Sequence, residues 1–225
     1  MQKIGVLLVF SVLLFPALPV RAQHMLSEGK IVYKVEVELP ADAPANAAGM
    51  FRGSHFDIAF KPYRTRTDMY LGQRYHYTTI HDTRDSSAVS LIEILQNKYL
   101  LRLSSGDVDT LQARYNGVTF RDVSGSRKIA GYICRKAIGQ LKDGSIFTVY
   151  YTPALSAAQD GFNGQFNGLQ GFPLEYEKTT HRGLKMVFTA TAVETEPLPA
   201  SWFDIPDSGY RELSPQEWRS MRQKD

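Results

Sequence analysis

The stretch Lys30–Leu39, "KIVYKVEVEL", alternates apolar and charged residues without a break. Its apolar residues all share one parity: Ile31, Tyr33, Val35, Val37 and Leu39. The other parity carries lysines and glutamates. Successive side chains of a strand point to opposite faces, so this pattern predicts a strand with one face in the core and one in water.

The same alternation continues along much of the chain. Residues 55–61 repeat it, with Phe56, Ile58 and Phe60 on one face. Further β-prone runs lie at 64–71, 74–82, 87–95, 98–104, 117–123, 174–179 and 184–195. Short turn sequences join them, among them Gln96-Asn97 and a predicted turn at 124–126. About ten strands, adjacent in sequence, predict a mainly β fold: a single curved antiparallel sheet or incomplete β-barrel.

The segment 128–153, "KIAGYICRKAIGQLKDGSIFTVYYTP", predicts a hairpin turned at Asp143-Gly144. Its second arm is apolar on both parities, with Phe147 and Val149 on one and Ile146 on the other. A strand that is apolar on both faces is expected to be covered on both. We therefore expect this hairpin to lie at the centre of the sheet.

One or two short helices are also expected. Between residues 106 and 114, the helical spacing of Val108 and Leu111 favours a short helix. Near the C-terminus, Ser214 is followed by Pro215 and Glu217, the pattern of an N-cap with a capping box. This pattern predicts a helix over about 214–222.

The first residues have the composition of a secretory signal. Lys3 precedes an apolar run over residues 4–18, and small residues follow at the spacing of a cleavage site. The run is shorter than the roughly 20 residues of a membrane span. We predict a signal peptide at 1–22, cleavage near Ala22 or Gln23, and a protein that is periplasmic or secreted.

Charge gives little reason to expect a polyanionic partner. Loss of Lys3 and Arg21 with the signal would change 26 Lys and Arg against 23 Asp and Glu to 24 against 23. Near neutrality does not favour nucleic acid or an anionic membrane, so no nucleic-acid partner is expected. The 43% hydrophobic content fits a packed globule, and we predict one β-rich domain over 23–225.

Cys134 is the only cysteine, so no internal disulfide can form. A nucleophilic thiol needs a lowered pKa, supplied by a paired histidine or a helix N-terminus. Cys134 instead lies in the middle of a predicted strand, with no histidine close before it. We predict that it is a buried core residue.

No other residue pattern indicates catalysis or a metal. His76 and His81 are five residues apart on one predicted strand, which places them on opposite faces. The chain contains no zinc-protease, nucleophile-elbow or phosphate-loop motif. We assign no catalytic residue, metal ligand or cofactor, and predict that the protein is not an enzyme.

The segment Asp160–Pro173, "DGFNGQFNGLQGFP", is too rich in glycine for a regular helix. It has two interpretations. It is a mobile flap over an apolar pocket, with glycine hinges, or a connection whose aromatic side chains seal one end of the core. In the first interpretation the gating residues are Phe162, Phe166, Leu169 and Phe172.

Three of these stretches carry a resemblance: "KIAGYICRKAIGQLKDG", "VYYTPAL" and "FNGLQGFPLEYE". Their order and spacing resemble the GLPGLI and related secreted proteins of unknown function from Gram-negative bacteria, which are similar to the LolA/LppX lipoprotein-carrier fold. The closing "WFDIPDSGYRELSPQEW" is similar to the end of that wider group. The resemblance covers roughly residues 29–218 and implies a LolA-like fold. No catalytic residues are established for the family, so none is transferred.

Together these observations favour a non-enzymatic binding or carrier protein for an apolar ligand, a lipid or an acyl chain. The apolar side chains expected to line its cavity are Tyr33, Val35, Phe56, Ile58, Phe60, Phe147 and Val149. The alternative is a structural or protein-interaction module of the cell envelope, with a filled core and a protein partner bound at a strand edge. An enzyme whose site is assembled from distant residues is the third class.

Overall fold

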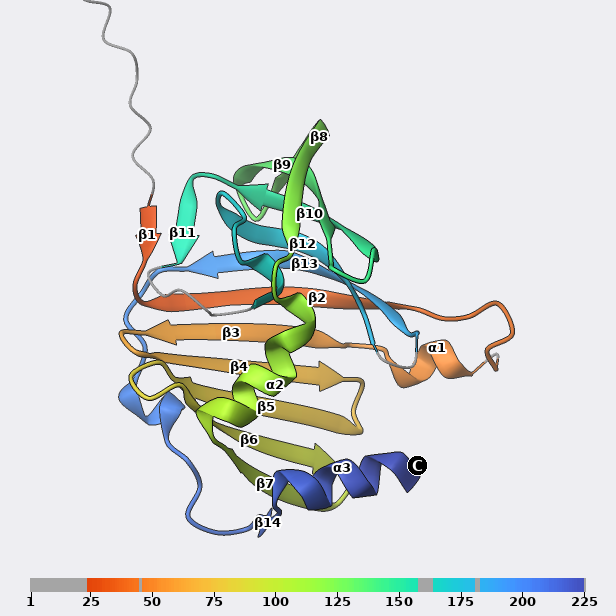
Figure 1. The fold of residues 1–225 in the computed structure, drawn as a ribbon, viewed down its shortest axis with the longest axis vertical. Helices are drawn as coiled ribbons and strands as arrows, with labels where there is room; N and C mark the ends of the chain where they lie inside the picture. The colour runs from red at the N-terminus through yellow and green to blue at the C-terminus, as the bar shows by residue number, and fades with distance from the viewer. Residues whose placement is uncertain (1–23, 45, 158–163, 181–182, 225) are drawn as a thin grey trace, which may run out of the picture.

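A computed structural model of the protein describes residues 24–44, 46–157, 164–180 and 183–224. The predicted signal peptide and its cleavage point lie outside these described residues. Strands make up most of the described chain and helices are few and short (Figure 1). The predicted fold class, mainly β with a large antiparallel sheet, is confirmed.

The strands follow the β-prone runs of the sequence. The first group is β1 (His24–Leu26), β2 (Gly29–Glu38), β3 (His55–Lys61), β4 (Arg64–Leu71), β5 (Tyr75–Asp82), β6 (Ser87–Ile94) and β7 (Asn97–Leu103). The second group is β8 (Thr119–Ile129), β9 (Tyr132–Gln140), β10 (Ile146–Thr152), β11 (Leu155–Ala157), β12 (Phe172–Thr179), β13 (Lys185–Glu194) and β14 (Arg211–Glu212). The helical segments are α1 (Ala47–Met50), α2 (Ser105–Gln112), η1 (Ala113–Tyr115), η2 (Gly164–Phe166), η3 (Ala200–Phe203) and α3 (Pro215–Lys224).

Twelve strands form one open sheet in the order β14-β7-β6-β5-β4-β3-β2-β13-β12-β10-β9-β8, and β1 pairs with β11 apart from it. Two antiparallel meanders make up eleven of these strands, and β14 pairs with β7 in parallel. The first runs from β2 to β7, and the second from β8 to β13. They are joined where β2 pairs with β13, from Lys30–Glu194 to Glu38–Lys185. The sheet ends in two strands with free edges, β14 and β8, so it does not close into a barrel.

This order forces one connection to cross the sheet. β7 and β8 are consecutive in sequence but lie near opposite ends of the sheet. The segment between them, α2 and η1, therefore runs across one face, as Figure 1 shows in green. Ser104 caps α2, because its hydroxyl accepts a hydrogen bond from the Asp107 N–H and the Asp107 carboxylate accepts one from the Ser104 N–H.

The sheet curves around α2. Leu103 of β7 and Lys178 of β12 line the same cavity, although seven strand positions separate β7 from β12. In a flat sheet these strands would lie roughly 33 Å apart. The face that carries α2 is therefore the concave face, and the opposite side is the rear face.

Aromatic side chains fill the concave face around the junction of the two meanders. The Tyr33 ring lies 5.8 Å from the Tyr176 ring, and Tyr176 stacks on Phe188 at 4.7 Å. Phe56 meets Phe188 edge to face at 5.5 Å. The Tyr33 hydroxyl donates a 2.8 Å hydrogen bond to the Pro173 carbonyl, which ties β2 to β12 across β13. These contacts hold the two halves of the sheet together.

The prediction that the 128–153 hairpin lies at the centre of the sheet is wrong. Its strands, β9 and β10, lie close to the β8 end of the sheet. The apolar residues on the second parity of β10 are not covered by another layer of the described chain. Ile146 is exposed, and Tyr150 packs under the side chain of Arg127, whose guanidinium carbon lies 3.7 Å from the ring centre. On this face a neighbouring cation thus covers the Tyr150 ring.

The predicted turn at 124–126 is also wrong. These residues form a bulge within β8, where the pairing with β9 shifts between Val123 and Ser126. Gly125 has φ +134° there, which a residue with a side chain rarely adopts. The chain turns instead at Ala130 and Gly131, both with positive φ, as a tight two-residue hairpin loop requires.

The Tyr33–Pro173 hydrogen bond leads to a first prediction. Tyr33→Phe should lower the free energy of unfolding by about 1–2 kcal/mol, since it deprives a buried carbonyl of its donor. Urea denaturation followed by tryptophan fluorescence measures the change. Tyr63→Phe is the matched control, because Tyr63 is 61% exposed and should lose almost nothing. Equal losses in the two variants would contradict this role for Tyr33.

Candidate ligand-binding cleft

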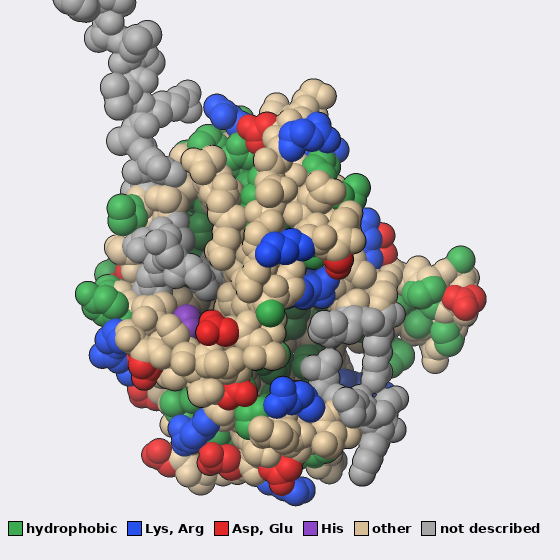
Figure 2. All heavy atoms as spheres, viewed as in Figure 1, with side chains coloured by type: hydrophobic (Ala, Val, Ile, Leu, Met, Phe, Trp, Pro, Cys, Tyr) green, Lys and Arg blue, Asp and Glu red, His purple; other side chains and the backbone are tan. Residues whose placement is uncertain are grey.

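Two adjoining cavities of about 600 and 390 Å³ lie between α2, α3 and the concave face. Five side chains line both of them: Tyr75, Tyr77, Leu103, Leu111 and Lys178. We call the two cavities together the cleft. Both volumes fall within the range of about 300–1,000 Å³ that is typical of ligand sites. Figure 2 shows this face, with hydrophobic side chains in its hollow and Lys and Arg side chains around it.

The floor of the cleft follows from strand alternation. On β4 and β5 every second residue faces α2, and three of these residues are threonines. The full set is Thr65, Thr67, Met69 and Leu71 on β4, and Tyr75, Tyr77, Thr79 and His81 on β5. Threonines leave space where the phenylalanines of the neighbouring half fill it. A cavity therefore lies over β4 and β5, whereas aromatic rings occupy the space over β2 and β13.

Helix α2 forms the roof. A helix packed directly on a sheet buries its apolar stripe, yet no residue of α2 is buried. Val108, Leu111 and Gln112 line the smaller cavity, and Leu111 is 60% exposed. Val108 packs against the apolar cluster of β6 and β7, whereas Leu111 faces the open space above the sheet. The C-terminal helix contributes Trp218, which lines the larger cavity and lies 6.1 Å from the Tyr99 ring.

Apart from its tyrosines, the ionisable groups of the cleft are basic. Lys178 and the exposed Arg114 line the larger cavity, His81 lines the smaller one, and no described Asp or Glu lines either. Burial lowers the pKa of the Lys178 ammonium, and the nearby charge of Arg114 lowers it further. Burial also lowers the pKa of His81, against the opposing effects of Asp82 and Asp85, so its ring is neutral at pH 7.

Within the described part of the chain, the Lys178 side chain makes no hydrogen bond or ion pair, and the His81 Nε2 is buried without a partner. The sequence analysis did not identify Lys178. The sequence did contain a pattern that could have identified this residue. Lys178 shares the parity of Leu174 and Tyr176, which places a cation on the apolar face of its strand.

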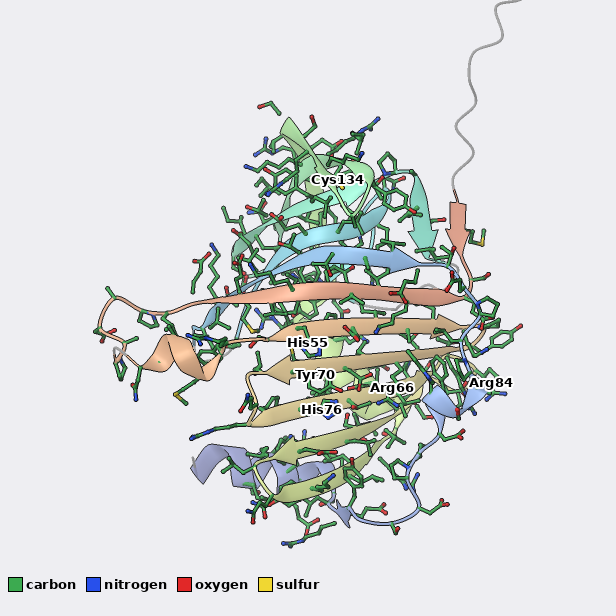
Figure 3. The ribbon with its side chains drawn as sticks, turned by 180° about the vertical axis from the view of Figure 1, so that it is seen from behind. His55, Arg66, Tyr70, His76, Arg84 and Cys134 are labelled. Atoms are coloured by element: carbon green, nitrogen blue, oxygen red, sulfur yellow. The ribbon has the colours of Figure 1, made fainter. Side chains whose placement is uncertain are left out.

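The rear face carries a polar network in which charges are already paired. The Asp68 carboxylate accepts hydrogen bonds from Arg66 Nε at 2.6 Å, Thr78 Oγ1 at 2.6 Å and His76 Nε2 at 3.1 Å. The His55, Tyr70 and His76 rings stack across β3, β4 and β5, with centroids 4.3 and 4.0 Å apart (Figure 3). Since this network balances its own charges, the cleft is the stronger candidate for ligand binding.

The two histidines are on opposite faces, as their spacing predicts. His76 lies in the rear-face network and His81 in the cleft. No group of three or more His, Cys, Asp or Glu that could hold a metal ion occurs among the described residues. Nor does any helix in the described ranges have the length and apolar character needed to cross a membrane.

Of the seven residues expected to line a cavity, Phe56 lines the cleft. The other six pack in the filled half of the concave face and are each at most 9% exposed: Tyr33, Val35, Ile58, Phe60, Phe147 and Val149. The alternation of apolar residues predicted the correct face of each strand. It did not distinguish the filled half of the concave face from the open half. Contact of these residues with a ligand stays a prediction.

The proposed gating residues also fall in the filled half. Phe172 is 2% exposed on β12, and Phe166 contacts the Phe147 and Tyr176 rings. Leu169 packs against the same cluster, while Phe162 lies outside the described residues. None of the three described residues lines the cleft. These contacts fit the sealing interpretation of the loop; its gating role stays a prediction.

Cys134 is fully buried in the core, as predicted. Its thiol lies 3.7 Å from the Tyr132 carbonyl, and burial raises the pKa of the thiol to about 11. A thiol with a raised pKa and no access to solvent is a poor nucleophile at neutral pH. The opposing strand position holds Arg127 rather than a histidine that could activate the thiol.

Comparisons with known proteins find solved structures with a similar fold but no matching sequence family. No family model matches the chain, and no curated protein matches it. The chain is similar to the structure of PNGF-II, with a TM-score of 0.50 and 15% identity, over 88% of this chain and 34% of PNGF-II. It thus spans about a third of that protein's length.

Two further solved structures are less similar. An uncharacterized conserved protein from Thermus thermophilus gives a TM-score of 0.47 at 9% identity, over 83% of this chain and 90% of that one. A LolA superfamily protein from Nitrosomonas europaea gives 0.27 at 10% identity, over 81% and 92%. These similarities are at low identity and concern the fold alone, and the resemblance seen in the sequence stays a prediction.

The burial of Cys134 predicts slow labelling. A thiol reagent such as Ellman's reagent should react with the native protein far more slowly than with urea-unfolded protein, because the sulfur is inaccessible and protonated. Cys134→Ser should lower the free energy of unfolding by about 1–2 kcal/mol, since it buries a hydroxyl. Labelling of the native protein as fast as of the unfolded chain would disprove the assignment.

The rear-face network predicts a pH dependence of stability. Burial acts to raise the pKa of Asp68, but the hydrogen bonds from His76, Arg66 and Thr78 outweigh it and hold this pKa well below its usual range. Ionised Asp68 therefore stabilises the folded state above the ordinary aspartate pKa of about 4, and this stability is lost as pH falls below that value. Asp68→Asn should cost about 2–3 kcal/mol at pH 7.

The difference between wild type and Asp68→Asn should shrink as urea denaturation is repeated from pH 7 down to pH 3. The exposed Asp42→Asn is the control and should behave like wild type throughout. A wild-type advantage that stayed constant over this range would show that the Asp68 carboxylate does not act through its charge.

Proposed function

We propose that the protein is a non-enzymatic binding or carrier protein that holds an apolar ligand, a lipid or an acyl chain, in the cleft beneath α2. The single observation that carries the proposal is the pair of adjoining cavities beneath a roof helix that buries none of its own residues and leaves Leu111 facing them. Such an arrangement exposes hydrophobic surface that an apolar occupant would cover.

The shape of the cleft supports an elongated ligand. It extends along β5 from Tyr75 to His81, a length of roughly 20 Å at the rise of a strand. The hydrocarbon core of a bilayer is about 30 Å thick, so one acyl chain spans about 15 Å. An acyl chain laid along β5 would therefore fit beneath α2.

The resemblance to the GLPGLI-related secreted proteins and the secretory character of residues 1–22 support a location in the periplasm or outside the cell. In this compartment a lipid must be shielded from water to cross between membranes. A carrier with an internal apolar cleft provides that shielding without any chemical step.

The alternative, an envelope module that binds a protein at a strand edge, has less support. The longer of the two edge strands is β8, which is interrupted by the bulge at Gly125 and carries Arg121, Arg127 and Lys128. Bulges and cations are features that prevent another strand from pairing with an edge. An open cleft also differs from the filled core that this alternative requires.

The test uses an uncharged fluorophore, N-phenylnaphthylamine, whose emission rises in apolar surroundings. The mature chain should bind it with saturation, and mass spectrometry of solvent extracts from gently purified protein should detect lipid. Thr79→Trp, which fills the cleft from its floor, should weaken binding by about tenfold or more because the ligand loses its volume.

The control is Thr119→Trp on the exposed strand β8, which should bind the fluorophore like wild type. Thermal unfolding of both variants shows whether they remain folded. Absence of fluorophore binding together with absence of lipid would refute the carrier function and leave the envelope module in its place.

A further inference from the structure

Lys178 is out of place for a purely apolar site. It lies on β12 on the same face as Tyr176, lines both cavities and is half-buried. A cation withdrawn from water is costly unless an opposite charge or hydrogen-bond acceptors compensate it. Within the described ranges no residue forms an ion pair or hydrogen bond with it.

The described surroundings of Lys178 add positive charge and no negative charge. Arg114, at the end of the α2–η1 segment, lines the same cavity. The neighbouring acid on β12, Glu177, occupies the opposite parity and pairs with Lys185 at 3.0 Å and with the Thr148 N–H at 2.9 Å. Glu177 therefore cannot serve as the counter-charge inside the cleft.

The two ends of the cleft differ in polarity. Lys178 pairs in the sheet with Met186, near the end of the strands that also holds Leu71 and Tyr75. His81, whose ring is neutral, lies at the other end of β5. The charged end is thus separated from the His81 end by the length of β5, and Met69, Tyr77 and other uncharged side chains lie between.

We propose that the ligand is a single-chain amphiphile with an anionic headgroup, a carboxylate or a phosphate, which pairs with Lys178 and Arg114 while its acyl chain lies along β5 towards His81. This inference rests on the proposed function and specifies its ligand. The anion supplies the counter-charge that the Lys178 side chain lacks among the described residues, and the acyl chain covers Leu111 of α2.

The experiment measures displacement of N-phenylnaphthylamine by three ligands of equal chain length: hexadecanoate, hexadecyl phosphate and uncharged hexadecanol, each below its aggregation threshold. At least one anion should bind about tenfold or more tightly than hexadecanol, the gain expected of a charge-assisted hydrogen bond away from bulk water. Whichever anion binds more tightly identifies the headgroup.

Lys178→Met keeps the length of the side chain and removes its charge. It should abolish the preference for the anions while hexadecanol binds as before or more tightly, and it should not lower thermal stability, because the lysine has no protein partner among the described residues. Lys128→Met, on the exposed strand β8, is the matched control and should keep the wild-type preference.

The outcomes separate the two proposals. Equal affinities of hexadecanoate, hexadecyl phosphate and hexadecanol for the wild type would overturn the anionic headgroup and leave apolar binding intact. A preference that persists in Lys178→Met would overturn the role of Lys178. Failure of all three ligands and of the fluorophore to bind would instead overturn the proposed function itself.

Discussion

The pairing of β2 with β13 is the interaction on which the rest of the structure depends. It joins the start of one meander to the end of the other, and so makes one sheet out of two. Because the junction is central, the strands that are consecutive at the middle of the chain, β7 and β8, are carried to opposite ends. The connection between them must cross the concave face, and this crossing places α2 over the sheet (Figure 1).

The two halves of the concave face then differ because of side-chain size. Around the junction, Tyr33, Tyr176 and Phe188 pack ring against ring and fill the space between them. Over β4 and β5 the corresponding positions include three threonines, and a cavity lies between these strands and α2. A filled half holds the fold together, so the other half can remain open without the loss of cooperative packing.

The rear face contributes stability by different means. Its hydrogen bonds and ion pairs, such as Lys30–Asp57 at 2.8 Å and the contacts of Asp68, link neighbouring strands on the side away from the cleft. Hydrogen bonds and ion pairs between partly buried groups are stronger than the same contacts in water, so they add to the stability of the sheet. The Lys178 side chain, on the concave face, lacks such a partner among the described residues, and this contrast supports the proposed anionic ligand.

The sequence by itself determined the local structure of this protein. Period-two alternation identified the strands and the face that each buries, the helical spacing of Val108 and Leu111 located α2, and the mid-strand position of Cys134 predicted its burial. These features depend on residues close together in the chain. Strand order, the position of the 128–153 hairpin near one end, and the cleft were decided only by tertiary structure. Each of these features depends on which strands pair across long distances in the chain. The pairing of β2 with β13, for example, brings Lys178 into the same cavity as Tyr75, beneath α2.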